Sequence, residues 1–555
     1  MLPPPASPLV AALSGLGVAL GGLAVGYLVV DALAGRRYPQ PIRVGLALPA
    51  AMAIVLALLL VHVATGGRVL SEPWVTRGVI AAIALAAVAL RIIRGGGPSG
   101  RSGTALLAMA VVALLVVALW GYPTTRLLPL DHAWDSDFHA GLANELINGE
   151  TLSHGTVTGA IPNDYPWMYH ALLATTASFM PGGRAQDAFD AVFFLQVIGG
   201  AFALFALGWE LTRKWYGGSA AALFGALSGG FGYLAHNGPA IVLDPRGQGG
   251  AEAVRRWGDM LFIRSYNMSF NNLAPTFPRD LGFALLPAFL LLLILGFRNR
   301  SLAALTAAGV VLGLTGLSTG ESMFAGLGTV VLIVAVPPVA RARSKERTGP
   351  DGEPPDRDRS AGPGPSRLRI AAALLLPSLG LWSLWIGPLA YNYFKFGGFT
   401  GSANSPVVLP AGAFLGAWGM TAIFAVVGLI VWLPAVRRDA GARIVLTMMV
   451  VVAGLLLLAH VFSKGFSTLS REHRYWPLMY LPLALLAAVG ATRILTTIGE
   501  RSRGVAIAVA VAIALLCVPS PILASVALPS AKHDQPEVER ALTGHRAMLS
   551  LVAPT

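Results

Sequence analysis

The chain has 555 residues, of which 55% are hydrophobic and 12% are charged, and its mean hydropathy is +0.67. Soluble proteins carry about 25% charged residues, so this composition excludes a soluble globular protein and predicts an all-α polytopic protein of the cell membrane. The formal net charge is +13, and the single cysteine, Cys517, excludes both a disulfide within the chain and a metal site built from cysteines.

Apolar runs long enough to cross a membrane recur along the whole chain. Each crossing takes about 20 mainly apolar residues, and the runs predict about fourteen helices. They cover residues 7–30, 44–66, 78–93, 104–120, 189–209, 216–235, 281–297, 302–317, 322–339, 368–390, 411–434, 444–462, 476–492 and 504–527. The expected organisation is N-terminal helices over 1–120, a first outer loop over 121–188, helices over 189–339 with a second outer loop at 236–280, a linker over 340–367, C-terminal helices over 368–527 and an outer tail over 528–555.

Lys and Arg are concentrated in every second connection between the apolar runs. The first run has no basic residue before it and is followed by Arg36 and Arg37, so the positive-inside rule predicts an extracytoplasmic N-terminus. The alternation continues along the chain and predicts an extracytoplasmic C-terminus as well. We therefore interpret the positive charge as an orientation signal and an attraction to anionic membrane lipid, not as a surface for nucleic acid.

Three connections are longer than the others. Residues 340–367 are rich in Pro, Gly and charge, which predicts a disordered cytoplasmic linker. The outer loops 121–188 and 236–280 instead carry Trp, Tyr, His, Asn and Asp among apolar residues. The orientation predicted from the basic connections places all ten histidines in outer loops or in the outer halves of helices. We expect these two loops to be structured and to carry the function.

The first outer loop contains the stretch DHAWDSDFHAGLANELINGE, residues 131–150. From Asp135 its periodicity predicts a short helix that stops at Gly149. One face carries Asp135, His139, Leu142 and Leu146, and the opposite face carries Asp137, Asn144 and Asn148. We expect the helix to lie on the membrane surface, with the side chains of Phe138, Leu142 and Leu146 in the lipid interface. The plainer alternative is that Asp135, Ser136 or Asp137 only caps the helix.

Two short motifs resemble those of the GT-C membrane glycosyltransferases, which use polyprenyl-phosphate or dolichyl-phosphate sugars. The first is the order Asp-x-Asp-x-His from Asp135 to His139, the helix to Gly149, and then Tyr165-Pro166-Trp167-x-x-His170. Trp167 stands where a second proline is common in that family. The second is SREHRYWPLMYLP, which is similar to the family's RY-x-x-P-x-x-P sequence at Arg474 and Tyr475, with looser spacing to the prolines. The overall look of the chain is similar to the actinobacterial arabinofuranosyltransferases.

The resemblance implies a GT-C-like fold and an inverting transfer of a sugar, arabinofuranose or mannose, from a polyprenyl-phosphate donor to a glycan of the cell envelope. Such a transfer needs a base for the acceptor hydroxyl, Asp135 or Asp137, and cations for the departing phosphate. Groups expected to bind substrate are His139, Tyr165, His170, Trp257, Arg279, Asp280, Arg471, Glu472, His473 and Arg474. For Arg471 and Arg474 the alternative is that the side chains only snorkel from a helix end.

Two acidic features of the sequence allow a second interpretation. The Asp135-x-Asp137 pair also suits a divalent cation, Mg²⁺ or Mn²⁺, because such ions prefer carboxylate oxygens. Glu321 is an acid inside an apolar region, yet the stretch from Ser318 to Glu321 has the S-x-x-E form of a capping box, which favours a structural role.

Two other classes of function compete with a glycosyltransferase. A transporter or flippase of lipid-linked sugars would carry ionisable residues along the middle of its helices, where the spans here have almost none. A non-enzymatic scaffold that binds a polymer would explain folded outer loops without needing an acidic pair.

Overall fold

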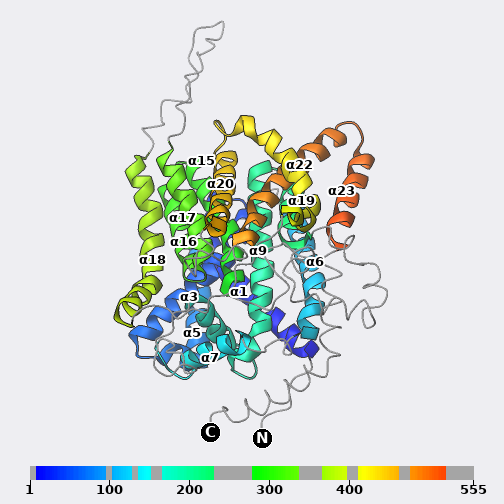
Figure 1. The fold of residues 1–555 in the computed structure, drawn as a ribbon. Helices are drawn as coiled ribbons and strands as arrows, with labels where there is room; N and C mark the ends of the chain where they lie inside the picture. Colours follow the sequence, from blue (N-terminus) through cyan, green and yellow to red (C-terminus); the bar gives the residue numbers. More distant parts are fainter. Residues whose placement is uncertain are drawn as a thin grey trace.

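The computed structural model describes residues 8–94, 103–127, 135–151, 166–229, 278–336, 365–396, 411–461 and 475–519. Within these ranges the chain forms helices and no strand, which confirms the all-α prediction (Figure 1). The N-terminal helices are α1 (Pro8–Ala34), η1 (Gly35–Arg37), α2 (Gln40–Gly45), α3 (Ala47–Ala64), α4 (Arg68–Ser71), α5 (Pro73–Ile93) and α6 (Gly103–Leu127). They are followed by α7 (Asp135–Ile147), α8 (Met168–Ala177), η2 (Ala185–Ala188), α9 (Phe189–Thr212), α10 (Trp215–Ala222) and η3 (Leu223–Leu227).

The remaining helices lie on both sides of the predicted linker. They are α15 (Pro278–Arg298), α16 (Leu302–Gly316), α17 (Gly320–Ala335), α18 (Arg367–Phe396), α19 (Ala411–Trp432), η5 (Leu433–Ala435), α20 (Ala440–Val461), η6 (Trp476–Met479), α22 (Tyr480–Gly499) and α23 (Arg503–Cys517). Local sequence explains several helix starts: Ser301 and Ser502 cap α16 and α23 by accepting from backbone N–H groups, and Pro73 opens α5.

Nine helices in the described ranges are long and apolar enough to cross a membrane, and four shorter apolar helices accompany them. This indicates a membrane-embedded protein. The predicted span 216–235 is described only as far as residue 229, and the expected total of about fourteen spans stays a prediction.

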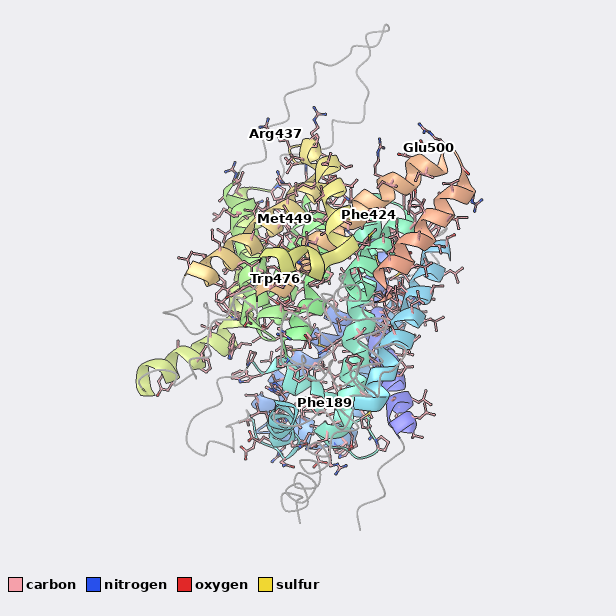
Figure 2. All side chains as sticks on the ribbon, turned by 45° about the vertical axis from the view of Figure 1, so that its right-hand side comes forward. Phe189, Phe424, Arg437, Met449, Trp476 and Glu500 are labelled. Carbon is pink, nitrogen blue, oxygen red and sulfur yellow. The ribbon has the colours of Figure 1, made fainter. Side chains whose placement is uncertain are left out.

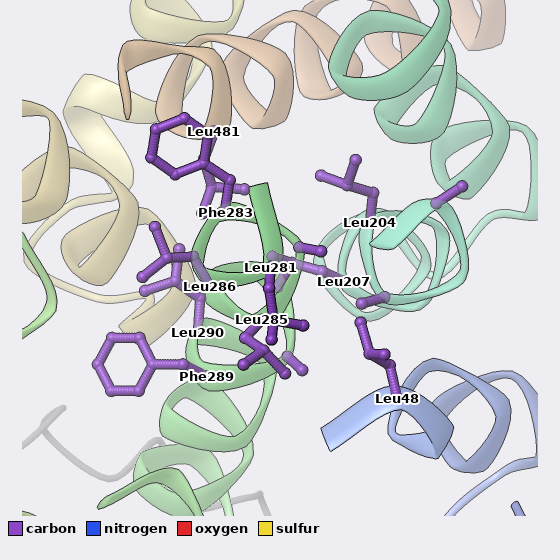
Figure 3. Packing of buried hydrophobic residues seen from close by; sticks show 14 of the residues in the cluster. Leu48, Leu204, Leu207, Leu281, Phe283, Leu285, Leu286, Phe289, Leu290 and Leu481 are labelled. Carbon is purple, nitrogen blue, oxygen red and sulfur yellow. The ribbon is translucent and has the colours of Figure 1, made fainter. Parts of the chain in front are cut away.

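The core of the bundle is formed around α15 and α9. Both are 94% buried over their most apolar window, whereas the corresponding windows of α5 and α18 are 11% buried. Figure 3 shows side chains of α15, including Leu281 and Phe283, packed between Leu204 of α9 and Leu481 of α22. The Tyr480 hydroxyl donates to the carbonyl oxygen of Phe283 at 2.6 Å, so α22 and α15 are joined by a hydrogen bond as well as by apolar packing.

Contacts between helix junctions that are far apart in the sequence define one end of the bundle, which we call the basic end. It comprises residues 31–43, 91–94, 210–216, 298–301, 437–441 and 493–503, and Figure 2 labels Arg437 and Glu500 there. Arg37 donates to Ser301 Oγ at 2.9 Å. The Tyr216 hydroxyl lies 2.8 Å from Thr496 Oγ1. These contacts bring together the junctions that are rich in arginine.

Two buried carboxylates at the basic end are each paired with arginines. Arg298 lies 2.9 Å from Glu210 and 2.9 Å from Asp439, and Arg213 lies 2.6 Å from the same Glu210 oxygen. Asp31 pairs with Arg43 and Arg91. These ion pairs therefore link the helix ends that they join, since each buried carboxylate would otherwise be left without a counter-charge.

The opposite end, which we call the histidine end, comprises residues 62–77, 135–151, 166–190, 278–282 and 317–321. The Met168 N–H donates to the Leu317 carbonyl oxygen at 3.2 Å, and Arg77 Nε donates to the Ser178 carbonyl oxygen at 2.5 Å. In Figure 1, α7 lies at the bottom of the molecule, and Figure 2 labels Phe189 near the same end. The alternation of basic and non-basic connections along the sequence therefore corresponds to two ends of one bundle.

Candidate functional site

Helix α7 begins at Asp135, the residue at which the sequence predicts its start, and ends at Ile147. The chain then turns at Gly149, whose φ of 96° is favourable for glycine and strained for other residues. Asp135 and Asp137 thus stand in the first turn of a helix, where the positive end of the helix dipole favours carboxylates. The side chains of both acids lie outside the described part of the structure.

The face of α7 that we expected to meet lipid instead meets protein. Leu142 is 3% exposed and Leu146 is 2% exposed, and both are covered by the bundle. The membrane-interface prediction for these two side chains is therefore wrong, because protein covers them; among the described elements, α8 and η2 pack against α7. Asn144 strengthens the docking, since its amide donates to Gln186 at 3.1 Å and accepts from the Ala185 N–H at 3.1 Å. The side chain of Phe138 is outside the described residues.

A hydrogen bond between two buried histidines joins α7 to α8. His139 Nδ1 lies 2.9 Å from His170 Nε2, and the rings are 2% and 1% exposed. The ring of Tyr169 packs edge-on against both, with centroids 5.5 Å from His139 and 6.0 Å from His170. These residues are 31 positions apart, so two separate segments of the first outer loop meet at one polar contact.

The histidine pair is neutral near pH 7. Burial lowers the pKa of His139 from 6.5 to about 4. Burial also lowers the pKa of His170 well below 6.5, and the neighbouring His139 lowers it further. A hydrogen bond between two neutral imidazoles holds one N–H between the rings, so one ring donates and the other accepts. The contact consequently requires that one of the two facing ring nitrogens stay unprotonated, so that it can accept.

His62 is a third buried histidine at this end, and sequence analysis did not identify it as a site residue. Its Nδ1 accepts from the Leu70 N–H at 3.0 Å, which leaves the proton on Nε2 to donate to the Glu150 carbonyl oxygen at 2.9 Å. The ring therefore connects the end of α3 to the segment that follows α7. The available signal was a histidine four residues before the pair Gly66-Gly67, at the end of an apolar run.

Arg279 and Asp280, both predicted to bind substrate, open helix α15. Arg279 Nε lies 3.7 Å from Asp280 Oδ1, and its guanidinium lies 5.9 Å from the ring centre of Phe283. Asp280 is 1% exposed. A Cβ added at Gly282 would lie 2.2 Å from a methyl carbon of Thr319, so the start of α15 presses against the connection between α16 and α17.

That connection also contacts α8, which carries His170. The backbone bond from Met168 to Leu317 joins it to the start of α8. The starts of α8 and α15 thus meet the same short segment, residues 317–319, from different directions. The structure in this way brings His139, His170, Arg279 and Asp280 to one end of the bundle, although more than 100 positions separate the two histidines from Arg279 and Asp280 in the sequence.

Glu321 has a structural contact that differs from the predicted capping box. Helix α17 begins at Gly320 with Thr319 as its N-cap, so Glu321 occupies the second helical position and not the third. The Thr319 hydroxyl donates to Glu321 Oε2 at 2.5 Å, and the Ser318 hydroxyl donates to the Leu314 carbonyl oxygen at 2.9 Å. The S-x-x-E prediction is wrong because the helix starts one residue later than that motif requires.

Six predicted site residues lie outside the described part of the chain: Tyr165, Trp257, Arg471, Glu472, His473 and Arg474. The described residue that follows them, Tyr475, is 1% exposed and leads into η6 and α22. Within the described ranges no group of three or more His, Cys, Asp or Glu side chains is arranged to hold a metal ion. The side chains of Asp135 and Asp137, the proposed ligands of a divalent cation, lie outside the described residues.

Comparison with known proteins finds no family model that matches the chain and no curated protein that matches it.

Proposed function

We propose that this protein is a membrane glycosyltransferase of GT-C type, which transfers a sugar from a polyprenyl-phosphate donor to a glycan of the cell envelope. The observation that carries the proposal is the docking of α7, whose first turn contains Asp135 and Asp137, onto α8 through the buried pair His139–His170. Such docking holds an acidic helix start in a fixed place at one end of an apolar bundle. A lipid-linked donor requires that combination, because its sugar lies at the membrane surface while its tail stays in the lipid.

In the proposed reaction, a carboxylate of α7 removes the proton from an acceptor hydroxyl. The hydroxyl oxygen attacks the anomeric carbon of the donor sugar, the bond from that carbon to the phosphate oxygen breaks, and the electron pair leaves with the polyprenyl phosphate. Inversion needs one carboxylate base and no nucleophile from the protein. Arg279, Arg471, His473 and Arg474 are the proposed cations for the departing phosphate, and Arg suits this task because its planar fork matches phosphate oxygens.

The histidine pair has a positioning role in this proposal. His139 stands one helical turn after Asp135, so a ring fixed by His170 also fixes the direction of the first turn of α7. The low exposure of both rings favours support of α7 over direct contact with a sugar. Tyr165, Trp257, Asp280 and Glu472 complete the proposed substrate-binding set.

The distribution of charge in the described spans supports an enzyme over a carrier of lipid-linked sugars. Asp31, Glu210 and Arg298 lie near the ends of their helices; Glu210 pairs with Arg298, and Asp31 pairs with arginines of the same basic end. A carrier needs ionisable groups along the path that the substrate crosses. The positive-inside rule supports the further proposal that the basic end faces the cytoplasm and the histidine end faces outward.

The deciding experiment measures transfer from radiolabelled polyprenyl-phosphate arabinose or mannose to a cell-wall acceptor by membranes that contain the full-length protein. Asp135→Asn and Asp137→Asn are compared with the wild type, and Asp187→Asn is the matched control because Asp187 pairs with Arg184 on the surface of the same end. Loss of the base is expected to reduce the transfer rate about 100- to 10,000-fold for one of the two variants.

The possible outcomes test the transferase activity and the identity of its catalytic base separately. Wild-type rates in both variants of α7 would overturn the assignment of the base while leaving the transferase in place. If the wild-type protein consumed neither donor, the glycosyltransferase proposal itself would be wrong. Equal losses in Asp187→Asn and in the α7 variants would indicate a general effect on folding.

A further inference from the structure

One corner of the basic end carries more cationic than anionic side chains, and two of its three described arginines are accessible from outside the bundle. It is formed where the last turn of α1, the helix α2 and the last turn of α5 meet. Asp31 is the acid in this corner, and it is paired with Arg43 and, at 2.8 Å, with Arg91. Arg94 donates to the carbonyl oxygen of Ala32 at 2.8 Å. Three arginines thus surround one carboxylate, which leaves a formal local charge of +2.

The surrounding sequence does not balance this charge. Residues 31–43 and 91–103 contain six arginines and one acid, Asp31. The nearest described carboxylate on another helix end, Glu210, already pairs with Arg213 and Arg298. A cluster of accessible arginines that outnumber their carboxylates favours a bound anion, because the guanidinium fork donates to phosphate oxygens through charge-assisted hydrogen bonds.

The corner opens on an apolar surface and not on a polar one. Leu33, Ile92 and Ile93 are 67%, 72% and 80% exposed, and Ile92 and Ile93 lie between Arg91 and Arg94 in the chain. Helix α5 has its most apolar window only 11% buried, so most of its surface faces outward from the bundle. In a membrane this surface contacts acyl chains, and the Arg91 and Arg94 side chains lie at the depth of the headgroups.

We propose that this corner is a binding site for an anionic phospholipid, with the phosphate on Arg91 and Arg94 and the acyl chains along Leu33, Ile92 and Ile93. Arg43, which is 5% exposed, holds Asp31 and thereby keeps Arg91 in place. The combination of an arginine pair with adjacent exposed aliphatic side chains matches a molecule that has both a phosphate and a hydrocarbon tail. The site is independent of the proposed glycosyltransferase activity, which uses the opposite end.

The test uses the full-length protein in nanodiscs of phosphatidylcholine alone and of phosphatidylcholine with phosphatidylglycerol, and it measures retained lipid by native mass spectrometry. The wild type is expected to retain phosphatidylglycerol in preference to phosphatidylcholine. Arg94→Gln is expected to weaken retention about fivefold, the contribution of one arginine near an anionic surface. Arg503→Gln is the matched control, because Arg503 is an exposed arginine at the same end of the bundle but on α23. This control is expected to retain the lipid as the wild type does.

A second variant and a soluble competitor complete the design. Arg94→Lys keeps the charge and is expected to retain phosphatidylglycerol, which distinguishes lipid binding from a folding defect of Arg94→Gln. Equal weakening by Arg94→Gln and Arg503→Gln would overturn the proposal in favour of a general attraction between the basic end and anionic membranes. Retention that does not distinguish the two lipids, or displacement of the lipid by millimolar inorganic phosphate, would overturn it as well.

Discussion

The three buried histidines at the histidine end make hydrogen bonds in which an unprotonated ring nitrogen is the acceptor. His62 uses Nδ1 as an acceptor, and the bond between His139 and His170 holds a single N–H. A proton added to His62 Nδ1 would place an N–H against the Leu70 N–H, and protonation of both His139 and His170 would place two N–H groups against each other. Burial disfavours the charged form of either ring of the pair as well. The docking of α7 is for this reason sensitive to pH, and the direction of the effect follows from the lowered pKa values.

The first prediction concerns the stability of the detergent-solubilised protein between pH 7.5 and pH 5. The pKa of His139 is 6.5 in its ordinary state and about 4 when buried, so between these values the unfolded ring binds a proton that the folded ring does not. Stability is therefore complete above about pH 6.5 and decreases as the pH falls toward 4, and His139 alone accounts for a loss of about 2 kcal/mol at pH 5. Thermal unfolding measured across this pH range tests it.

The comparison variant for this prediction is His139→Asn, which keeps a polar side chain but does not titrate. It is expected to be less stable than the wild type at pH 7.5 and to lose less of its remaining stability on acidification. A variant that loses as much stability as the wild type between pH 7.5 and pH 5 would show that other groups cause the acid sensitivity.

At the scale of elements, the position of α7 depends on a tight turn between α3 and α4. Gly67 has a φ of 90°, and a Cβ added there would lie 1.7 Å from the carbonyl oxygen of Gly149, which ends α7. His62 lies at the end of α3 and donates to the next residue, Glu150. The turn at 65–67 and the turn at 148–150 therefore pack directly against each other. Gly67 is required both because a Cβ has no room there and because its φ is positive, and Gly149 is required because its φ is positive.

The second prediction uses two adjacent glycines of this turn. Gly67→Ala is expected to destabilise the protein by about 3 kcal/mol, because the new methyl group overlaps the backbone of Gly149 and the left-handed conformation is itself unfavourable. Gly66→Ala is the matched control: its φ is 66°, but nothing lies within 4 Å of an added Cβ. It is expected to cost about 1 kcal/mol from the backbone alone. Equal shifts in the thermal midpoint of the two variants would contradict the contact with α7.

Sequence periodicity was sufficient to predict helix α7 but not to predict what packs against it. The start at Asp135 and the stop at Gly149 follow from apolar spacing and from glycine, which act within a few residues. The burial of Leu142 and the bond from His139 to His170 depend instead on a second segment, whose docking leaves no periodic signal in either stretch. An apolar helix face looks the same in a sequence whether it meets lipid or protein. The Ser318–Glu321 motif misled for a similar reason. A shift of one residue in the start of α17 changes which side chains can reach each other at the helix start.

At the scale of the whole molecule, the alternation of charge in the sequence anticipated the grouping of helix junctions into two ends. Each span reverses the direction of the chain, so connections that alternate in composition must gather at opposite ends. The pairs Asp31–Arg43 and Glu210–Arg298 within the basic end were not predictable, because several arginines in that group were equally available to each acid. The sequence thus predicted which residues share an end but not which of them touch.

The third prediction tests the orientation of these two ends. In a Cys517→Ala background, single cysteines at Asn148 and Arg300 occupy exposed turns at the histidine end and the basic end. With a membrane-impermeant maleimide, Asn148→Cys is expected to react in intact cells and Arg300→Cys only after the cells are permeabilised. The reverse pattern would place the basic end outside and would overturn the proposed direction of the glycosyl transfer.

The contrast between inner and outer helices also has a consequence for biogenesis. Helix α15 has a hydropathy of 2.3 and is 94% buried, while α5 has a hydropathy of 1.9 and is 11% buried. Helix α15 is synthesised after α9 but before α16, α20 and α22, which contact it in the folded bundle, so part of its surface is still uncovered when it is inserted. The high hydropathy of α15 therefore suits its insertion into the membrane, whereas its close packing against neighbouring helices suits the folded bundle. For this reason hydropathy alone does not separate the helices that end at the centre of the bundle from those that remain at its edge.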